Sequence, residues 1–352
     1  MVTLVSHCVK NVRSKVYSAS RCSSVDRLIF KCFSEMLQAG QSQGNATVGL
    51  VFLERVLFST LTTAPYCIFF FINVTLLFTL RSKALFRDSS RYVLLFNLVM
   101  ADTLQMTLSQ LLYLLSVCRV VLTYPVCGLL VMFANLTNEI SPLTLVVMSL
   151  ERYVAVCYPL RHAAIVTIRN TAVAVAVVWF LTSLNVLTRV LLLLDFPFEK
   201  LDTLQMSNFC SLFVMFLGSM SDDYDKAYTC FLFVSATVTI ASTYVGVMVA
   251  ARSASADKAS AHKARNTLLL HLVQLGLSLL STMHNAMLVA VSKIVTLNLL
   301  LRLLNVFYVF IILLPRCLSC LIYGLRDKSI RPVLLFHLCC RLKVSTKTQV
   351  SP

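Results

Sequence analysis

Residues 151–160 read Glu-Arg-Tyr-Val-Ala-Val-Cys-Tyr-Pro-Leu, closing a long apolar run and opening a basic loop. Glu151, Arg152 and Tyr153 therefore lie where a hydrophobic helix would leave a membrane. Charges at such a place are costly unless they pair with each other or face water. Arg152 cannot lose its proton in a protein, so it can pair with Glu151 in one state and turn toward a partner in another. The stretch predicts a two-state ion pair at the cytoplasmic face, or else a charge cluster that only sets membrane topology.

The composition of the chain is that of an integral membrane protein. Of its 352 residues, 58% are hydrophobic and only 13% are charged, whereas a soluble domain carries about 25% charged residues. The net charge of +16 comes from basic residues between the apolar runs, a pattern that sets membrane topology and does not indicate a nucleic-acid partner. The 13 cysteines are scattered, without the paired C-x-x-C sets of zinc sites. The sequence also lacks a phosphate loop, HExxH and GxSxG, so neither a metal site nor an enzyme is expected.

Seven apolar runs are long enough to cross a bilayer, which takes about 20 residues. They cover residues 56–80, 92–116, 123–150, 171–194, 226–251, 266–291 and 297–323. The sequence thus predicts an all-α integral membrane protein, with a seven-helix transmembrane bundle at residues 56–325. The stretch from Ser329 to Leu338 is amphipathic and predicts a short helix after the seventh span, within a tail at 326–352. No internal repeat is visible, which argues against a transporter built from repeats.

The charges of the loops predict the orientation of the bundle. Lysine and arginine are concentrated in the first, third and fifth loops and in the tail, whereas the loop at 195–225 is acidic. The positive-inside rule then places the amino terminus outside and the tail in the cytoplasm. The segment 1–55 should be extracellular, although residues 1–44 are basic and lack the apolar core of a signal peptide. We expect these residues to be disordered, or to be an upstream extension before a natural start at Met36.

Two longer stretches resemble one receptor family. The stretch from Met148 to His162, MSLERYVAVCYPLRH, resembles the DRY region of rhodopsin-like G-protein-coupled receptors and the MAYDRYVAIC-PL signature of odorant receptors. The stretch from Lys263 to Leu272 resembles the KAxxTCxxHL sequence that opens the sixth helix of odorant receptors. The fit is best to fish-type odorant receptor-like proteins. The resemblance implies a plasma-membrane receptor that binds a small odorant or water-soluble ligand from outside and activates a heterotrimeric G protein.

The resemblance also assigns residues to switching and G-protein coupling. These residues are Glu151, Arg152, Tyr153, Tyr244, His271 and Tyr323. The seventh helix departs from the family's NPxxY pattern, because Ser319 and Cys320 stand in place of its asparagine and proline. This departure leaves open a receptor-like protein with weakened signalling. A small-solute transporter with a polar path is a further alternative, against which the lack of repeats counts.

Asp102 lies inside the second span, where a carboxylate needs a partner or a polar cavity. It resembles the buried aspartate of the receptor family, and the resemblance places Asn73, Ser141 and Ser319 around it. Together these residues resemble the family's sodium and water pocket, so a sodium ion near Asp102 is the one cofactor implied. The alternative is a hydrogen bond between helices, worth ~0.6 kcal/mol.

The ligand pocket is expected between the outer halves of the third, fifth, sixth and seventh helices. Asn135, Asn138 and Glu139 have i, i+3 and i+4 spacing, which predicts one polar helix face. Helical position adds four residues to the wall, namely Tyr228, Thr229, Met283 and Tyr308. A carboxylate at Glu139 favours a cation or a strong hydrogen-bond donor as the ligand. Alternatively, Glu139 bonds between the third, fourth and fifth helices with Arg189 as its partner.

Several covalent features are expected. The resemblance makes Cys127 the family's extracellular cysteine and Cys210 its disulfide partner, with Cys118 as a competitor. Asn45 begins an N-x-T glycosylation sequence in the predicted outer segment. Cys339 and Cys340 follow the amphipathic stretch and are candidates for palmitoylation, which would add contact with membrane lipids.

Overall fold

The computed structural model describes residues 46–118, 120, 122–194, 210, 219–253, 269, 272–284, 287, 290–291, 294–295, 299, 303, 305–325, 327 and 329–343. Within these ranges the side chains of 46–55, 219, 222, 251–253, 320, 323, 325 and 338–343 are not described. Five helices are long and apolar enough to cross a membrane: α3 (Ala46–Ser82), α5 (Ser90–Val117), α6 (Tyr124–Cys157), α8 (Ile168–Leu194) and α10 (Ser219–Ser253). Two shorter apolar helices, Leu272–Thr282 and Asn305–Ser319, fall within the sixth and seventh predicted spans. The described residues thus confirm an all-helical bundle.

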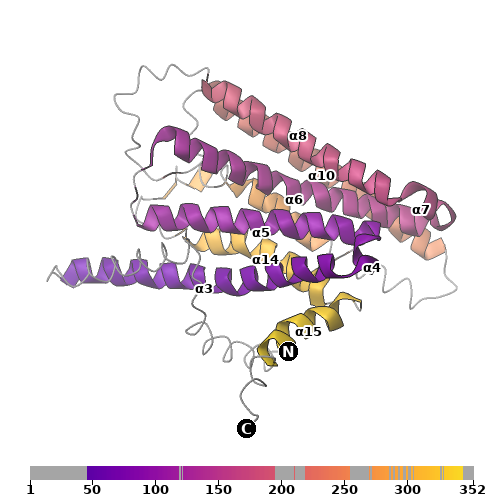
Figure 1. Cartoon of the computed structure of the whole chain (residues 1–352). Coiled ribbons are helices and arrows are strands. Elements are labelled where there is room, and N and C mark those ends of the chain that lie inside the picture. Colours follow the sequence, from indigo (N-terminus) through magenta and orange to yellow (C-terminus); the bar gives the residue numbers. More distant parts are fainter. Residues whose placement is uncertain are drawn as a thin grey trace, which may run out of the picture.

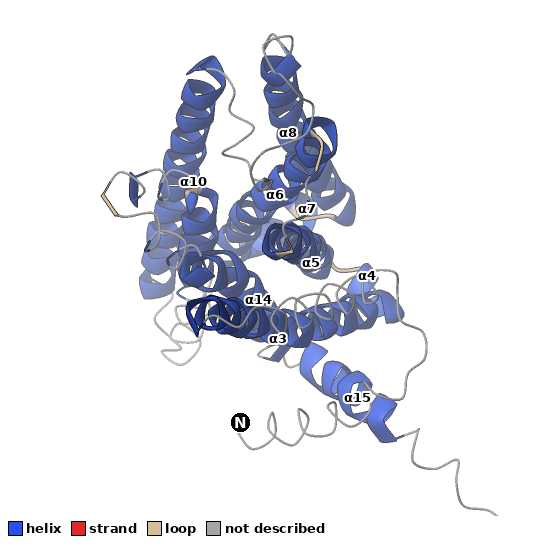
Figure 2. Ribbon diagram, turned by 90° about the vertical axis from the view of Figure 1, so that its left-hand side faces the viewer, coloured by secondary structure: helices blue, strands red, loops and turns tan. Residues whose placement is uncertain are grey.

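The long helices lie side by side, with α6 at the centre (Figure 1). α6 packs against α5, α8 and α10, and α5 also packs against α3. Figure 2 shows α8 and α10 on one side of the bundle and α3 on the other. Between them lies a core of buried leucines from α3, α5 and α6, including Leu76, Leu98 and Leu145. Large apolar side chains such as Phe71, Phe180 and Phe231 are exposed on the outer faces, as expected where lipid replaces water as the solvent.

Three short helices gather at one end of the bundle (Figure 1). They are α4 (Ala84–Arg87), α7 (Pro159–Ile165) and α15 (Ile330–Lys343). α15 confirms the helix predicted after the seventh span and buries Ile330 and Leu334. It is joined to α3 by a hydrogen bond of 2.9 Å between the Thr79 hydroxyl and His337 Nδ1. We call this the Arg152 end of the bundle, and the opposite end the Cys127 end.

Some helix boundaries differ from the predicted ones. α3 begins at Ala46, so residues 46–55, predicted to belong to an extracellular segment ahead of the bundle, continue the first span as a helix. α6 continues to Cys157. Within the helix Glu151 and Arg152 form an ion pair, and the Tyr153 ring packs edge-on against Tyr158. α10 begins at Ser219, which brings Asp225 from the predicted acidic loop into a helix.

The last span is irregular around a proline. A π-helical segment, η3 (Tyr308–Leu313), leads into α14 (Leu314–Cys320), and a second π-helical segment, η4 (Leu321–Leu325), follows. Pro315 lies at the start of α14, where a proline lacks the N–H of the regular helical ladder and kinks the helix. Arg316 and Ser319 follow at i, i+3 spacing, so they share one face of α14.

Candidate functional site

The end of the central helix carries the ion pair expected from the sequence. Arg152 Nε lies 3.2 Å from Glu151 Oε2, with 23% and 10% of the two side chains exposed. His162 of α7 approaches the other oxygen of Glu151, at 3.8 Å. The pair is therefore shielded but within reach of water, where a second anion or acceptor can compete for the guanidinium.

Tyr153, the neighbour of Arg152 in α6, packs against α10, which also carries Tyr244. A Cβ at position 246 would overlap the Tyr153 ring, so Gly246 is required for the close contact between α6 and α10. Tyr244 borders a small, mostly apolar cavity between α6, α10 and helix Leu272–Thr282, together with Leu145 and Ser149. These residues of the predicted switch therefore meet where three helices converge at the Arg152 end.

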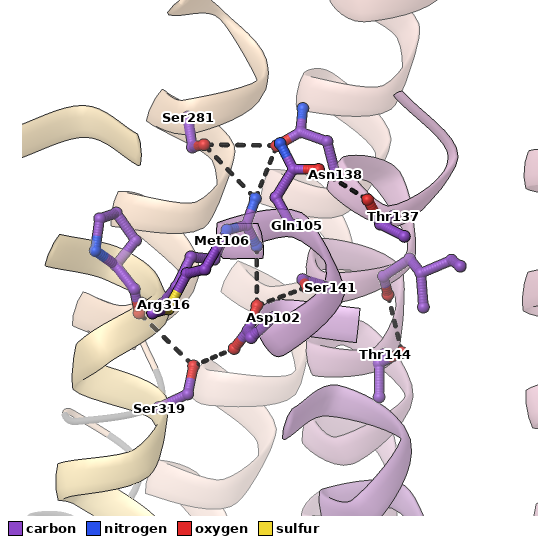
Figure 3. Close-up of polar contacts among 12 residues, drawn as sticks. Asp102, Gln105, Met106, Thr137, Asn138, Ser141, Thr144, Ser281, Arg316 and Ser319 are labelled. Atoms are coloured by element: carbon purple, nitrogen blue, oxygen red, sulfur yellow. Dashed lines mark hydrogen bonds and ion pairs between the residues drawn. The ribbon is translucent and has the colours of Figure 1, made fainter. Parts of the chain in front are cut away.

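A buried ion pair occupies the middle of the bundle (Figure 3). Arg316 Nη1 of α14 lies 2.9 Å from Asp102 Oδ1 of α5, and both side chains are 1% exposed. The Ser141 hydroxyl of α6 donates to the same oxygen at 2.6 Å, and the Ser319 hydroxyl donates to Oδ2. The structure thus brings three of the four predicted pocket residues together, namely Asp102, Ser141 and Ser319.

The fourth predicted residue, Asn73, does not reach Asp102. Its amide is fully buried and donates to the Met106 sulfur at 3.7 Å. The side chain that completes the pocket is Arg316, whose other nitrogen, Nη2, donates to Asn138 Oδ1 at 2.6 Å and to Ser281 at 3.4 Å. The guanidinium therefore lies against the carboxylate where the sequence predicted a sodium ion. This set of residues, which already contains its own cation, does not fit a sodium ion.

A second buried polar network lies toward the Cys127 end, between α6, α8 and α10. Asn185 Nδ2 of α8 donates to both oxygens of Glu139, at 2.7 and 2.9 Å, and the Tyr228 hydroxyl of α10 donates to Oε2 at 3.1 Å. Arg189 lies 3.6 Å from Glu139 and is hydrogen-bonded to Asp225. The alternative in which Glu139 bonds between the third, fourth and fifth helices is thus the one that the contacts support.

The prediction that Asn138 and Glu139 share one polar face of α6 is wrong. Glu139 faces α8 and α10 through the contacts above, whereas Asn138 faces Arg316 and Ser281. Adjacent residues of an α-helix point about 100° apart, so the two side chains serve different networks. Asn135 Nδ2 is buried and has no hydrogen-bond partner among the described residues. This amide is therefore a hydrogen-bond donor still available to a ligand in the Cys127 half of α6.

The remaining residues of the predicted ligand wall have different surroundings. Tyr308 is buried, donates to Gln110 Oε1 at 2.8 Å and stacks on Tyr113, so it is bound to α5. Tyr228 belongs to the Glu139 network, and Thr229 beside it is partly exposed, as is Met283. Of the predicted wall, Asn135, Thr229 and Met283 are the residues whose side chains are not engaged in these networks.

A disulfide joins Cys127 to Cys210, with a distance of 5.7 Å between the Cα atoms. This confirms the predicted pair, and Cys118, the competitor, is bonded elsewhere. The bond ties Cys210 to the first turn of α6. Both cysteines are buried with Val131, in a cluster that also contacts Leu112.

We expect Cys127→Ser or Cys210→Ser to remove most of the protein from the cell surface, because losing a native disulfide costs about 2–5 kcal/mol. Surface staining of tagged variants, with mass mapping of non-reduced peptides from the wild type, measures this. Cys230→Ser is the matched control, since Cys230 is an exposed free cysteine on α10. Surface levels of Cys127→Ser equal to those of Cys230→Ser would contradict the structural role of the bond.

Sequence reasoning missed the polar partners that complete the networks. They are Asn185 and Asp225 around Glu139, Gln274 and Ser281 around Asp102, and Asn97, which accepts from Trp179 and donates to Thr144. The signal that would have found them is the presence of amides and acids within apolar spans. Five predicted positions lie outside the described part: His271 and Asn45 entirely, and Tyr323, Cys339 and Cys340 in their side chains.

Comparisons with known proteins agree with this architecture. Residues 72–323 match the model of the 7 transmembrane receptor (rhodopsin family). Odorant receptor 131-2 of Danio rerio is 30% identical over 315 residues, which cover 88% of this chain and 95% of that protein. Olfactory receptor 4K15 of Homo sapiens is 28% identical over 162 residues, covering 44% and 48% of the two chains. Olfactory receptor 1500 of Rattus norvegicus is 30% identical over 103 residues, covering 29% and 33%.

The structure agrees with these matches: it is a bundle of membrane-spanning helices with an ion pair at one end of its central helix and a disulfide at the other. The chain therefore belongs to the odorant receptors of the rhodopsin family of seven-transmembrane receptors.

Proposed function

We propose that this chain is a chemosensory receptor of the plasma membrane that binds a small ligand in the Cys127 half and activates a heterotrimeric G protein at the Arg152 end. The observation that carries the proposal is the Glu151–Arg152 pair of 3.2 Å at the end of the central helix. Its position beside the convergence of α6, α10 and helix Leu272–Thr282 lets a shift of these helices change the partner of Arg152. A ligand can bias such a two-state element only if it binds one state better.

The proposed orientation places the Arg152 end in the cytoplasm and the amino terminus outside. Exposed basic side chains border the short helices at that end, namely Arg81, Lys83, Arg87, Arg161 and Arg169. Such an excess of lysine and arginine in short loops is typical of the cytoplasmic side. A G protein would then meet the ion pair from inside the cell, and the ligand would enter from the disulfide-bonded side.

A ligand panel in cells that display the chain tests the proposed coupling. Cyclic AMP should rise with ligand dose in these cells and stay at background in mock-transfected cells. A compound that raises the unfolding temperature of the purified chain, yet leaves cyclic AMP unchanged, would contradict coupling and favour a receptor-like protein with weakened signalling.

The charge of the Glu139 network favours a cationic ligand. Among the described ion pairs of this network, two carboxylates, Glu139 and Asp225, share one guanidinium, Arg189, which leaves one formal negative charge in excess. The rings of Tyr224 and Tyr228 lie within 6.0 Å of the guanidinium carbon, and aromatic faces attract cations. A small water-soluble amine, or a molecule with several hydrogen-bond donors, would offset the excess charge.

We therefore expect matched amines to be more potent than their neutral isosteres on the wild type, by about tenfold for each 1.4 kcal/mol of added attraction. Glu139→Gln should reduce this difference, because it removes the excess negative charge. Dose–response curves of cyclic AMP for both ligand kinds, in both proteins, measure the effect. Equal potency of amines and isosteres on the wild type would refute the proposed ligand class without touching the proposed coupling.

A further inference from the structure

The pair of Asp102 and Arg316 is sealed within the bundle. The two side chains are 1% exposed, and Arg316 is among the largest fully buried side chains of the described residues. A lone charge at this depth is costly in a membrane. The 2.9 Å contact between opposite charges removes the net charge of the pair. Each of the two charges therefore needs the other to be stable at this depth.

Both oxygens of the carboxylate already accept from donors of the protein. Oδ1 accepts from Arg316 at 2.9 Å and from Ser141 at 2.6 Å, and Oδ2 accepts from Ser319. Ser319 in turn accepts from Gln274 of helix Leu272–Thr282. The hydroxyls turn their hydrogens toward the carboxylate, and a second cation beside it would be repelled by the guanidinium.

The guanidinium also extends the cluster to further helices. Nη2 donates to Asn138 Oδ1 of α6 at 2.6 Å and lies 3.4 Å from the Ser281 hydroxyl, which itself donates to Asn138. Figure 3 shows Arg316 between Asp102 on one side and Asn138 with Ser281 on the other. One side chain thus joins α5, α6, helix Leu272–Thr282 and α14.

We propose that Arg316 is the built-in cation of this pocket. Its guanidinium holds the position that a free sodium ion would take beside Asp102, and the ion pair acts as a clasp between four helices. The clasp makes the stability of the protein independent of sodium. Any rearrangement that separates α14 from α5 must break this ion pair.

Thermal unfolding of the purified full-length chain in detergent tests the proposal. The unfolding midpoint is measured in sodium chloride and in N-methyl-D-glucamine chloride of equal ionic strength. The wild type and Arg316→Lys should give the same midpoint in both salts. Arg316→Gln keeps Asp102, Ser141 and Ser319 but loses the cation, so its midpoint should be higher in sodium chloride.

Two further variants serve as controls. Asp102→Asn/Arg316→Gln removes both charges and should unfold at the same temperature in both salts. Arg91→Gln breaks a different ion pair, that with Asp327 at the Arg152 end, and should not make the midpoint depend on sodium.

Three outcomes would overturn the proposal. The first is a wild-type midpoint that rises in sodium chloride, with the rise lost in Asp102→Asn. The second is an Arg316→Gln protein that unfolds equally in both salts. If Arg316→Gln is not recovered folded, the double variant decides, because two charges that act as a pair should be removable together. Failure of the double variant to fold, beside a folded Asp102→Asn, would be the third contradicting result.

Discussion

Arg152→Ala should abolish ligand-evoked cyclic AMP while leaving the protein at the cell surface. The guanidinium is permanently charged and lies 3.2 Å from Glu151 at the end of α6. Removing it deletes the positive charge at the helix end that can change partner between Glu151 and a bound protein. The fold should tolerate the change, because the side chain is 23% exposed and Glu151, with which it pairs, is its neighbour in the same helix. The measurement is the maximal cyclic AMP response, normalised to surface staining, which should fall to the background of mock-transfected cells.

Arg161→Ala is the matched control for this experiment. Arg161 is an exposed arginine on α7, in the same basic segment. If Arg152 only set membrane topology, the two substitutions would act alike, since the positive-inside rule counts charges and not positions. An undiminished response in Arg152→Ala would rule out the proposed switch.

Arg189→Met should strongly destabilise the Cys127 half of the bundle. It leaves Glu139 and Asp225, two side chains that are 6% and 15% exposed, without their shared cation. Breaking a buried ion pair by removing one partner costs about 3–5 kcal/mol, which is a large part of the stability of a typical protein. We expect most of the variant to be retained inside the cell, with a lowered unfolding midpoint for the purified fraction.

The control for this substitution lies on the same helix. Arg169 is exposed near the start of α8, so Arg169→Met removes an arginine without stranding an acid. Adding Glu139→Gln to Arg189→Met should recover part of the surface level, because it removes the more buried of the two stranded charges. Equal surface levels for Arg189→Met and Arg169→Met would show that the network does not stabilise the fold.

The spans could be predicted from the sequence because each depends on a local property. A run of about 20 apolar residues must cross the bilayer as a helix. Each of the five long helices contains nearly all of one predicted run, although α3 and α10 begin earlier than predicted and α6 ends later. The pairing of Cys127 with Cys210 was also predictable, because it came with the resemblance of the whole receptor domain.

The polar networks could be predicted only in part, because they depend on which helix faces meet. Asp102 and Arg316 are 214 residues apart in the chain, and no local pattern relates their faces. Asn138 and Glu139 are neighbours in sequence but point to different helices, which a count of polar residues does not reveal. Asp225 was assigned to an acidic loop, although it lies in α10 and pairs with Arg189.

Nucleotide exchange on a purified heterotrimeric G protein is the most direct test of the central claim, that ligand binding in the Cys127 half is coupled to the Arg152 end. The wild-type chain, reconstituted in lipid with a ligand that raises its unfolding midpoint, should accelerate binding of a guanine-nucleotide analogue in proportion to ligand occupancy. Arg152→Ala should bind the same ligand without accelerating exchange. The account would be contradicted by a ligand that stabilises the wild type and leaves the exchange rate at its unliganded value.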